Sequence, residues 1–324
     1  MAPLTLDLSS LARRESLGDP SELYIRASRI PAMCPREEVL VHDNRVQRSS
    51  SVSVTLALSF AAGHGYHDAI REHVLPRLGV LVGSWRCVDC GASYGDPREP
   101  VPLRVEDGVA PPALESFLVP RPDVCSGCGG DNLRFRELKY AAPEYHTGGS
   151  PDGYIRLSPG SENAGIPYRV GLGLWELKTT AVPWDVRSSP FLAHMIQVQT
   201  YLWFTGLGWA VILYWVKGMD ESNHAQVLVA HLVDRDEVTI AAIREALAAV
   251  RDGVNGGPLP GRICDEPSCA RAKECAVRAR CFSLPDRPDA AQEEGEPEED
   301  PATGDDRWSA PEPVADLAAE EVVF

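Results

Sequence analysis

Two acidic residues and one lysine occur in a pattern that suits metal-assisted chemistry. Asp152 lies in a glycine-rich run, 148–154, at the start of a predicted strand, and Glu176 and Lys178 lie in the run 174–180. On a strand, side chains two positions apart point to the same face. Converging carboxylates suit a hard cation such as Mg²⁺, which can polarise a phosphodiester and activate water. A lysine beside the cation can position that water or stabilise the developing negative charge.

Each of these motifs also has a simpler structural interpretation. An Asp-Gly pair is common in turns, and Glu-x-Lys on a strand is commonly a solvated face. Glu176 and Lys178, however, are flanked by Leu174, Trp175 and Leu177, and Leu177 is predicted to point into the core. Burying a charge is costly unless the charge is partnered or functional. We therefore predict a catalytic site on this strand.

The elements that must position these residues are a mixture of strands and helices. Predicted strands span residues 150–158, 168–179, 209–217 and 225–234. Predicted helices begin at residue 36 and span parts of 53–78, 191–204 and 238–250. This mixture predicts an α/β fold with a mixed central sheet flanked by helices.

Two further motifs complete a resemblance to a known family. The order Asp, then Glu-x-Lys, resembles the PD-(D/E)XK nucleases. Gly63-His-Gly-Tyr-His67 resembles the Gly-x-x-x-His motif of their RecB-like branch, whose histidine is a metal ligand. Gln197-Val-Gln-Thr-Tyr201 resembles the Gln-x-x-x-Tyr motif of that branch, and an i, i+4 pair lies on one helical face. The motifs also follow one another in the family's order.

The resemblance implies a restriction-endonuclease-like core and metal-dependent hydrolysis of DNA phosphodiester bonds. We expect an exonuclease acting on single-stranded ends, in DNA repair, recombination, phage DNA metabolism or CRISPR adaptation. Lys178 would act on the water, and Gln197 and Tyr201 would orient the site. The expected ligands of Mg²⁺ or Mn²⁺ are His67, Asp152, Glu176 and Leu177.

Four of the nine cysteines form two Cys-x-x-Cys pairs, each followed by glycine: Cys87, Cys90, Cys125 and Cys128. This spacing lets both thiolates of a pair reach one ion, and four thiolates predict a tetrahedral Zn²⁺ site. We expect a zinc ribbon inserted at 84–138 that stabilises a segment without a core of its own. A role in gripping DNA or a partner is the alternative, and disulfide pairing is disfavoured in a cytoplasmic chain.

The remaining cysteines resemble the ligands of an iron–sulfur cluster. Cys34 precedes a proline, as the N-terminal ligand does in iron–sulfur RecB-like exonucleases, which include CRISPR-associated adaptation nucleases and AddAB-type subunits. That resemblance implies a [4Fe–4S] cluster joining both ends of the domain. The expected ligands are Cys34, Cys269, Cys275 and Cys281, with Cys264 as an alternate. The spacing departs from the family's triplet because no cysteine occurs at Ala272. A zinc site made from the four C-terminal cysteines alone stays open, with Cys34 as a buried apolar residue.

The net charge of −16 is unevenly distributed. Residues 285–324 hold 14 acidic and 2 basic residues, which leaves the rest of the chain with a net charge of only −4. The predicted organisation is therefore an N-terminal part of the nuclease domain (1–83), the ribbon (84–138), the nuclease core with the cysteine cluster (139–284) and a disordered acidic tail (285–324). The tail is interpreted as solubilising, with docking to a replication or repair protein as the alternative.

Two broader expectations complete the sequence prediction. No apolar run of about 18 residues and no secretion signal is recognised, so we expect a cytoplasmic protein. The rival class is a non-catalytic DNA-binding or recruitment protein that uses the zinc ribbon and the acidic tail. Against that class, every position of the nuclease pattern carries a competent residue.

Overall fold

The structure is a computed structural model. It describes residues 5–7, 24–43, 51–95, 103–105, 114–159, 169–180, 186–217 and 228–286. The predicted acidic tail beyond residue 286 lies outside the described residues. Within the described ranges, no helix has the length and apolar character needed to cross a membrane.

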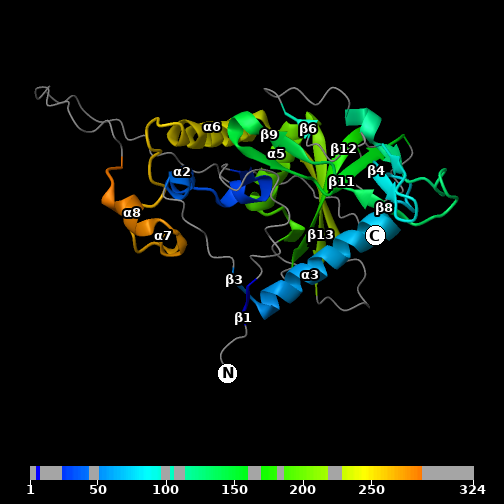
Figure 1. Cartoon of the computed structure of the whole chain (residues 1–324), viewed down its shortest axis with the longest axis horizontal. Coiled ribbons are helices and arrows are strands. Elements are labelled where there is room, and N and C mark those ends of the chain that lie inside the picture. The colour runs from blue at the N-terminus through cyan, green and yellow to red at the C-terminus, as the bar shows by residue number, and fades with distance from the viewer. Residues whose placement is uncertain are drawn as a thin grey trace, which may run out of the picture.

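A mixed sheet forms the centre of the described fold (Figure 1). Its strands lie in the order β14-β13-β12-β11-β4-β5, and β7 and β8 also pair with β4. Only β12 and β13 are parallel among the described pairs of this sheet. The strands are β4 (Leu81–Cys87), β5 (Ser93–Tyr94), β7 (Val119–Pro120), β8 (Leu133–Arg136), β11 (Gly153–Leu157), β12 (Gly171–Thr180), β13 (Trp209–Val216) and β14 (Leu228–Asp234).

The parallel pairing of β12 and β13 requires a crossover, and helix α5 (Leu192–Thr205) supplies it. The helix ends at Gly206, which adopts the left-handed conformation (φ 69°) that favours glycine, and its N–H donates to the carbonyl of Leu202. This crossover carries Gln197 and Tyr201 back over the face of β12 that bears Glu176.

Both faces of β13 are buried, which explains its nearly continuous apolar sequence. Ala210, Ile212 and Tyr214 pack into the core beneath α5 and α6 (Glu237–Val254), whereas Val211 and Leu213 pack into a second core on the opposite face. Figure 1 shows α5 and α6 on one side of the sheet and α3 (Val54–Ala69) on the other.

Smaller elements surround this framework. A second sheet has the order β2-β10-β9-β6, with β2 at Ile25–Arg26, β6 at Leu103–Arg104, β9 at Tyr140–Ala142 and β10 at Thr147–Gly149. β1 (Thr5–Asp7) pairs with β3 (Ser51–Ser53). The other helical segments are η2 (Ala27–Ala32), α2 (Pro35–Asp43), η3 (Ile70–Val74), η4 (Leu114–Phe117), η5 (Pro143–Tyr145), α7 (Ala270–Glu274) and α8 (Arg278–Ser283).

The prediction of a mixed α/β fold is confirmed. The four predicted strands overlap β11 to β14, and the predicted helices overlap α2, α3, α5 and α6. One feature was not expected: β4 belongs to both the main sheet and the ribbon. Its first part pairs with β11 at Leu81 and Val82, and its last part pairs with β8 from Ser84 to Cys87.

The C-terminal described segment packs against α2. Arg36 is fully buried, and its guanidinium donates hydrogen bonds to four backbone carbonyls of the C-terminal segment. The accepting residues are Pro260 (2.9 Å), Cys281 (3.4 Å), Pro285 (2.7 Å) and Asp286 (3.2 Å). Figure 1 shows α7 and α8 next to α2, at the opposite end of the molecule from the ribbon strands β4 and β8.

Candidate active site and cysteine sites

The predicted catalytic residues come from four separate parts of the fold. His67 lies in the last turn of α3, and Asp152 directly precedes β11. Glu176 lies on β12, and Gln197 and Tyr201 lie one turn apart on α5. These side chains, together with Lys178 of β12, form one continuous hydrogen-bonded group.

Glu176 is the centre of this group. Its Oε1 accepts hydrogen bonds from Lys178 Nζ (2.8 Å) and Gln197 Nε2 (3.0 Å), and its Oε2 accepts one from the backbone N–H of Asp152 (3.3 Å). Lys178 Nζ also donates to Gln197 Oε1 (2.9 Å), so one amide side chain orients both charged groups. Gln197 Nε2 in turn donates to the hydroxyl of Tyr201 (3.1 Å).

Asp152 is held from two sides. Its Oδ1 lies 3.0 Å from His67 Nδ1, and its Oδ2 accepts a hydrogen bond from the backbone N–H of Leu177 (2.7 Å). The Leu177 side chain is fully buried in the second core, as predicted, so only its backbone carbonyl could serve as a metal ligand. The structure thus places Leu177 directly beside the acidic pair.

Burial and neighbouring charges shift the pKa values of the two carboxyl groups in opposite directions. Burial, and after it the charge of Asp152, raises the pKa of Glu176 to about 7, against the opposing effect of Lys178. Burial also acts to raise the pKa of Asp152, but the hydrogen bond and charge of His67 outweigh it and the pKa is lowered. The same contact with Asp152 outweighs burial and raises the pKa of His67. The group therefore pairs an ionised acid with one that ionises near neutrality.

The donor set suits a hard divalent cation, with carboxylate and backbone oxygens plus one imidazole. As the side chains stand, hydrogen bonds among them satisfy the acids, and the donor atoms of His67, Asp152 and Glu176 do not all lie within 4.8 Å of one another. His67, Asp152, Glu176 and the Leu177 carbonyl are the groups that would hold such a cation.

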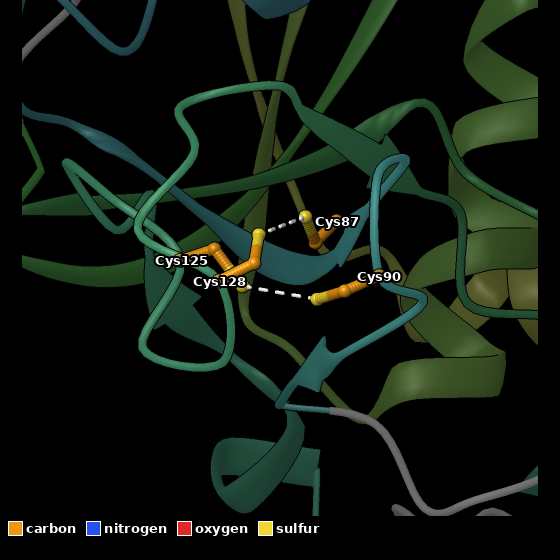
Figure 2. Close-up of side chains that lie close together, drawn as sticks. All are labelled: Cys87, Cys90, Cys125 and Cys128. Atoms are coloured by element: carbon orange, nitrogen blue, oxygen red, sulfur yellow. Dashed lines mark hydrogen bonds between the residues drawn. The ribbon is translucent and has the colours of Figure 1, made fainter.

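The ribbon cysteines behave differently, because their four sulfur atoms all lie within 4.8 Å of one another. Figure 2 shows the pairs across the site: the sulfurs of Cys87 and Cys128 are 3.6 Å apart, and those of Cys90 and Cys125 are 3.5 Å apart. Such distances far exceed a disulfide bond and are close to the separation of about 3.8 Å between thiolates around a tetrahedral Zn²⁺. The cluster is consistent with a metal site.

The two Cys-x-x-Cys segments share one backbone shape. The N–H of Gly91 donates to the carbonyl of Cys87 (2.9 Å), and the N–H of Gly129 donates to the carbonyl of Cys125 (2.7 Å). Both glycines have a positive φ, 77° and 76°, which a residue with a Cβ adopts only under strain. This explains why a glycine follows each pair in the sequence.

Four of the five remaining cysteines border a small cavity between α2 and the C-terminal segment. Cys34, Cys264, Cys275 and Cys281 line it, and its free space for water-sized molecules is about 20 Å³. Cys269 instead caps α7, because its Sγ accepts the N–H of Ala272 (3.3 Å). No three of these five described cysteines bring their sulfurs within 4.8 Å of one another. The structure places Cys34 beside the C-terminal cysteines, and Cys264 rather than Cys269 lines the cavity.

Two residues with a part in these sites were missed in the sequence. Tyr94 donates a hydrogen bond to Cys125 Sγ (3.2 Å), which lowers the pKa of that thiol to about 6. Arg36 ties α2 to the C-terminal cysteine segment. Arg36 follows Cys34 by two positions, but nothing in the sequence indicates that its partners are carbonyls more than 220 residues away.

Comparison with known proteins adds little to this geometry. No protein-family model matches the sequence, and no curated protein gives a significant match. Among solved structures, the chain is similar to an alkaline exonuclease (LHK-Exo) from Laribacter hongkongensis, with 15% identity over 72% of this chain and 88% of that one and a TM-score of 0.38. The complex of LHK-Exo with dAMP gives 15% identity over 73% and 90%, with a TM-score of 0.40.

A third structure, of the protein SSO0001, matches with 15% identity over 74% of this chain and 81% of that one, at a TM-score of 0.36. Identity and TM-score are both too low in these matches to assign an activity to this chain.

Proposed function

We propose that this protein is a metal-dependent deoxyribonuclease with a restriction-endonuclease-like core and an active site of the PD-(D/E)XK type. One observation carries the proposal: Asp152, Glu176, Lys178 and Gln197 are buried or nearly so, and they converge in one hydrogen-bonded group. Folding would not place two acids and a lysine together inside a core for stability alone, because desolvating them costs free energy.

Each residue has a distinct part in this proposal. Asp152, Glu176, His67 and the Leu177 carbonyl would hold Mg²⁺ or Mn²⁺, which when bound polarises the phosphodiester and lowers the pKa of a water. Lys178 would position the attacking water and stabilise the developing negative charge. Gln197 orients Lys178 and Glu176 through a hydrogen bond to each, and Tyr201 orients the amide of Gln197 by accepting a hydrogen bond from it.

The finer features of the activity rest on the motif resemblance. These are exonucleolytic action, a preference for single-stranded DNA ends, and a role in DNA repair, recombination, phage DNA metabolism or CRISPR adaptation. The ribbon would hold Zn²⁺ through its four cysteines, and their sulfur separations fit that ion. A [4Fe–4S] cluster would be held by Cys34, Cys275 and Cys281 with Cys264 as the fourth ligand, since these border the cavity, or with Cys269 in its place.

A direct test measures release of nucleotides from end-labelled single-stranded DNA in the presence of Mn²⁺. Glu176→Gln and Lys178→Ala should abolish it, whereas Asp252→Asn, which removes an exposed carboxylate from α6, should leave the rate unchanged. Digestion by the two site variants at the parental rate would show the proposal to be wrong. DNA binding without cleavage by the parent protein would favour the rival non-catalytic class.

A further inference from the structure

A polar pocket lies directly beside the candidate active site, and the proposed catalytic scheme does not use it. It is lined by residues of β2 and η2, by the residue before β9, by the end of β10 and by α5. Its free space for water-sized molecules is about 160 Å³, far above the roughly 10–15 Å³ that one water requires. The lining residues are Tyr24, Arg26, Ala27, Ser28, Lys139, Gly149, Ser150 and Tyr201.

The pocket and the active site share a wall. Tyr201 lines the pocket and also accepts the hydrogen bond from Gln197, the residue that orients Glu176 and Lys178. Gly149 and Ser150 lie on the same chain segment as Asp152 and precede it by three and two positions. A Cβ at Gly149 would lie only 3.2 Å from Tyr201 Cε1, so the glycine lets the backbone approach the Tyr201 ring closely.

The charges around the pocket favour an anion. Arg26 and Lys139 both line it, and within the described part of the chain neither forms an ion pair with a carboxylate. Glu137 accepts a hydrogen bond from Ser150 Oγ (2.9 Å). Glu137 is neutralised by Arg71, whose guanidinium lies 2.7 Å away. Glu176 and Asp152 lie behind the Tyr201 wall, where Lys178 and His67 pair with them. Two cations are thus left to act on a ligand.

The pocket also offers an aromatic surface. Tyr24 is 39% exposed, and its hydroxyl lies over Gly148, where an added Cβ would approach it to 2.5 Å. A nucleic-acid strand presents phosphates for cations and flat bases for aromatic rings, and this combination is typical of single-strand binding surfaces. A free inorganic anion would use the two cations only.

We propose that this pocket binds the nucleotide next to the scissile phosphate of a single-stranded DNA substrate. Arg26 and Lys139 contact its phosphate, and Tyr24 stacks on its base. The proposal rests on the proposed nuclease function, because it derives its substrate from that function. It adds a binding subsite that positions the strand relative to Glu176 and Lys178.

The test measures binding of an oligothymidylate of about a dozen nucleotides to protein carrying Glu176→Gln, which prevents cleavage. In this background Arg26→Gln with Lys139→Gln should lower affinity about tenfold at near-physiological salt. The slope of log affinity against log salt should also become shallower by about 0.7, because the pocket neutralises one phosphate and each neutralised single-strand phosphate contributes about 0.7. Arg26→Lys with Lys139→Arg should restore both quantities.

The matched control is Arg77→Gln with Lys273→Gln, which makes the same charge change at exposed positions outside the pocket. Tyr24→Ala should weaken binding about tenfold, and Tyr24→Phe should not. Equal affinity and equal slope in the pocket variant and the control overturn the subsite, as does a failure of the Glu176→Gln protein to bind the oligonucleotide.

Failure of the nuclease proposal gives a different pattern. If the parent protein does not cleave DNA but Arg26→Gln with Lys139→Gln still loses binding, the subsite stands and the catalytic proposal falls. If the parent cleaves and the pocket variant binds like its control, the catalytic proposal stands and the subsite falls.

Discussion

The ribbon and the carboxylate site are assembled in opposite ways. The ribbon thiols come from two short segments, one at the end of β4 and one in the turn before β8, and their sulfurs already lie within 4.8 Å of one another. The carboxylate site draws on residues from His67 to Tyr201, carried by two helices, a strand and a turn, and its acids are held by hydrogen bonds to other side chains. We therefore expect a bound metal to stabilise the ribbon, whereas hydrogen bonds within the fold hold the carboxylate site together.

The largest expected effect separates catalysis from stability at the carboxylate site. Glu176→Gln keeps the shape of the side chain but removes the charge, so cleavage should fall by about a thousandfold, or about 4 kcal/mol. The midpoint of thermal unfolding should not fall, because the raised pKa of Glu176 means that the folded protein favours an uncharged side chain at this position. Initial rates and calorimetry measure the two quantities. A parallel loss of stability would contradict a site held by the fold.

A substitution in the ribbon should have the opposite effect: metal binding should fall, and DNA cleavage should stay nearly unchanged. Cys128→Ser replaces one exposed ligand and should cost roughly 3–4 kcal/mol of zinc binding, about a quarter of the ~10–16 kcal/mol typical of a structural site. Zinc content by atomic emission and competition with a chelator measure the loss. Cleavage of DNA should stay within about twofold of the parent, because β11 and β12 do not contribute ligands to the ribbon. Unchanged zinc content would show that the four thiols are not its ligands.

A smaller effect is expected at Tyr94, whose hydroxyl contacts a ribbon cysteine. Tyr94→Phe removes the hydroxyl that donates to Cys125 Sγ and accepts from the N–H of Ser126. Without that donor the thiolate is less stabilised, and zinc affinity should fall about tenfold, in the range typical of residues that orient a metal ligand. The matched control is Tyr66→Phe, which removes a hydroxyl outside the ribbon and should leave zinc affinity unchanged. Equal zinc affinity in the two variants would show that the Tyr94 hydroxyl does not support the site.

The smallest effect concerns pH at the carboxylate site. The pKa of Glu176 is raised to about 7, so the acid is protonated below that pH and must lose its proton to bind a cation. Affinity for Mn²⁺ should therefore fall by at most about tenfold when the pH is lowered from about 8 to about 6. The raised pKa of Glu176 also makes the stability of the folded protein depend on pH. Between the ordinary pKa of a glutamate and this raised value, the folded protein without metal loses stability as pH rises. Isothermal titration at the two pH values measures the affinity, and an affinity independent of pH would contradict the role of Glu176.

Part of the carboxylate site could be predicted from local periodicity, and the motif resemblance implied that its separate parts converge. Strand geometry places Glu176 and Lys178 on one face, and helix geometry places Gln197 and Tyr201 on another, and both sets meet in the structure. The clustering of the four ribbon cysteines could be predicted because each Cys-x-x-Cys pair is local.

Contacts between distant segments could not be predicted. The sequence does not indicate that β4 continues from the sheet into the ribbon, that Tyr94 reaches Cys125, or that Cys264 borders the cavity in place of Cys269. Each of these features depends on how separate elements pack, and neither periodicity nor residue spacing along the chain predicts that packing.

The buried guanidinium of Arg36 has a consequence for synthesis of the chain. The four carbonyls that it contacts lie 224 to 250 residues later in the sequence. During translation, α2 therefore leaves the ribosome long before its partners exist, and contacts of such high sequence separation form late in folding. The contacts of Arg36 can therefore form only after residues 260–286 have been made, which leaves this buried guanidinium without its carbonyl partners for most of synthesis.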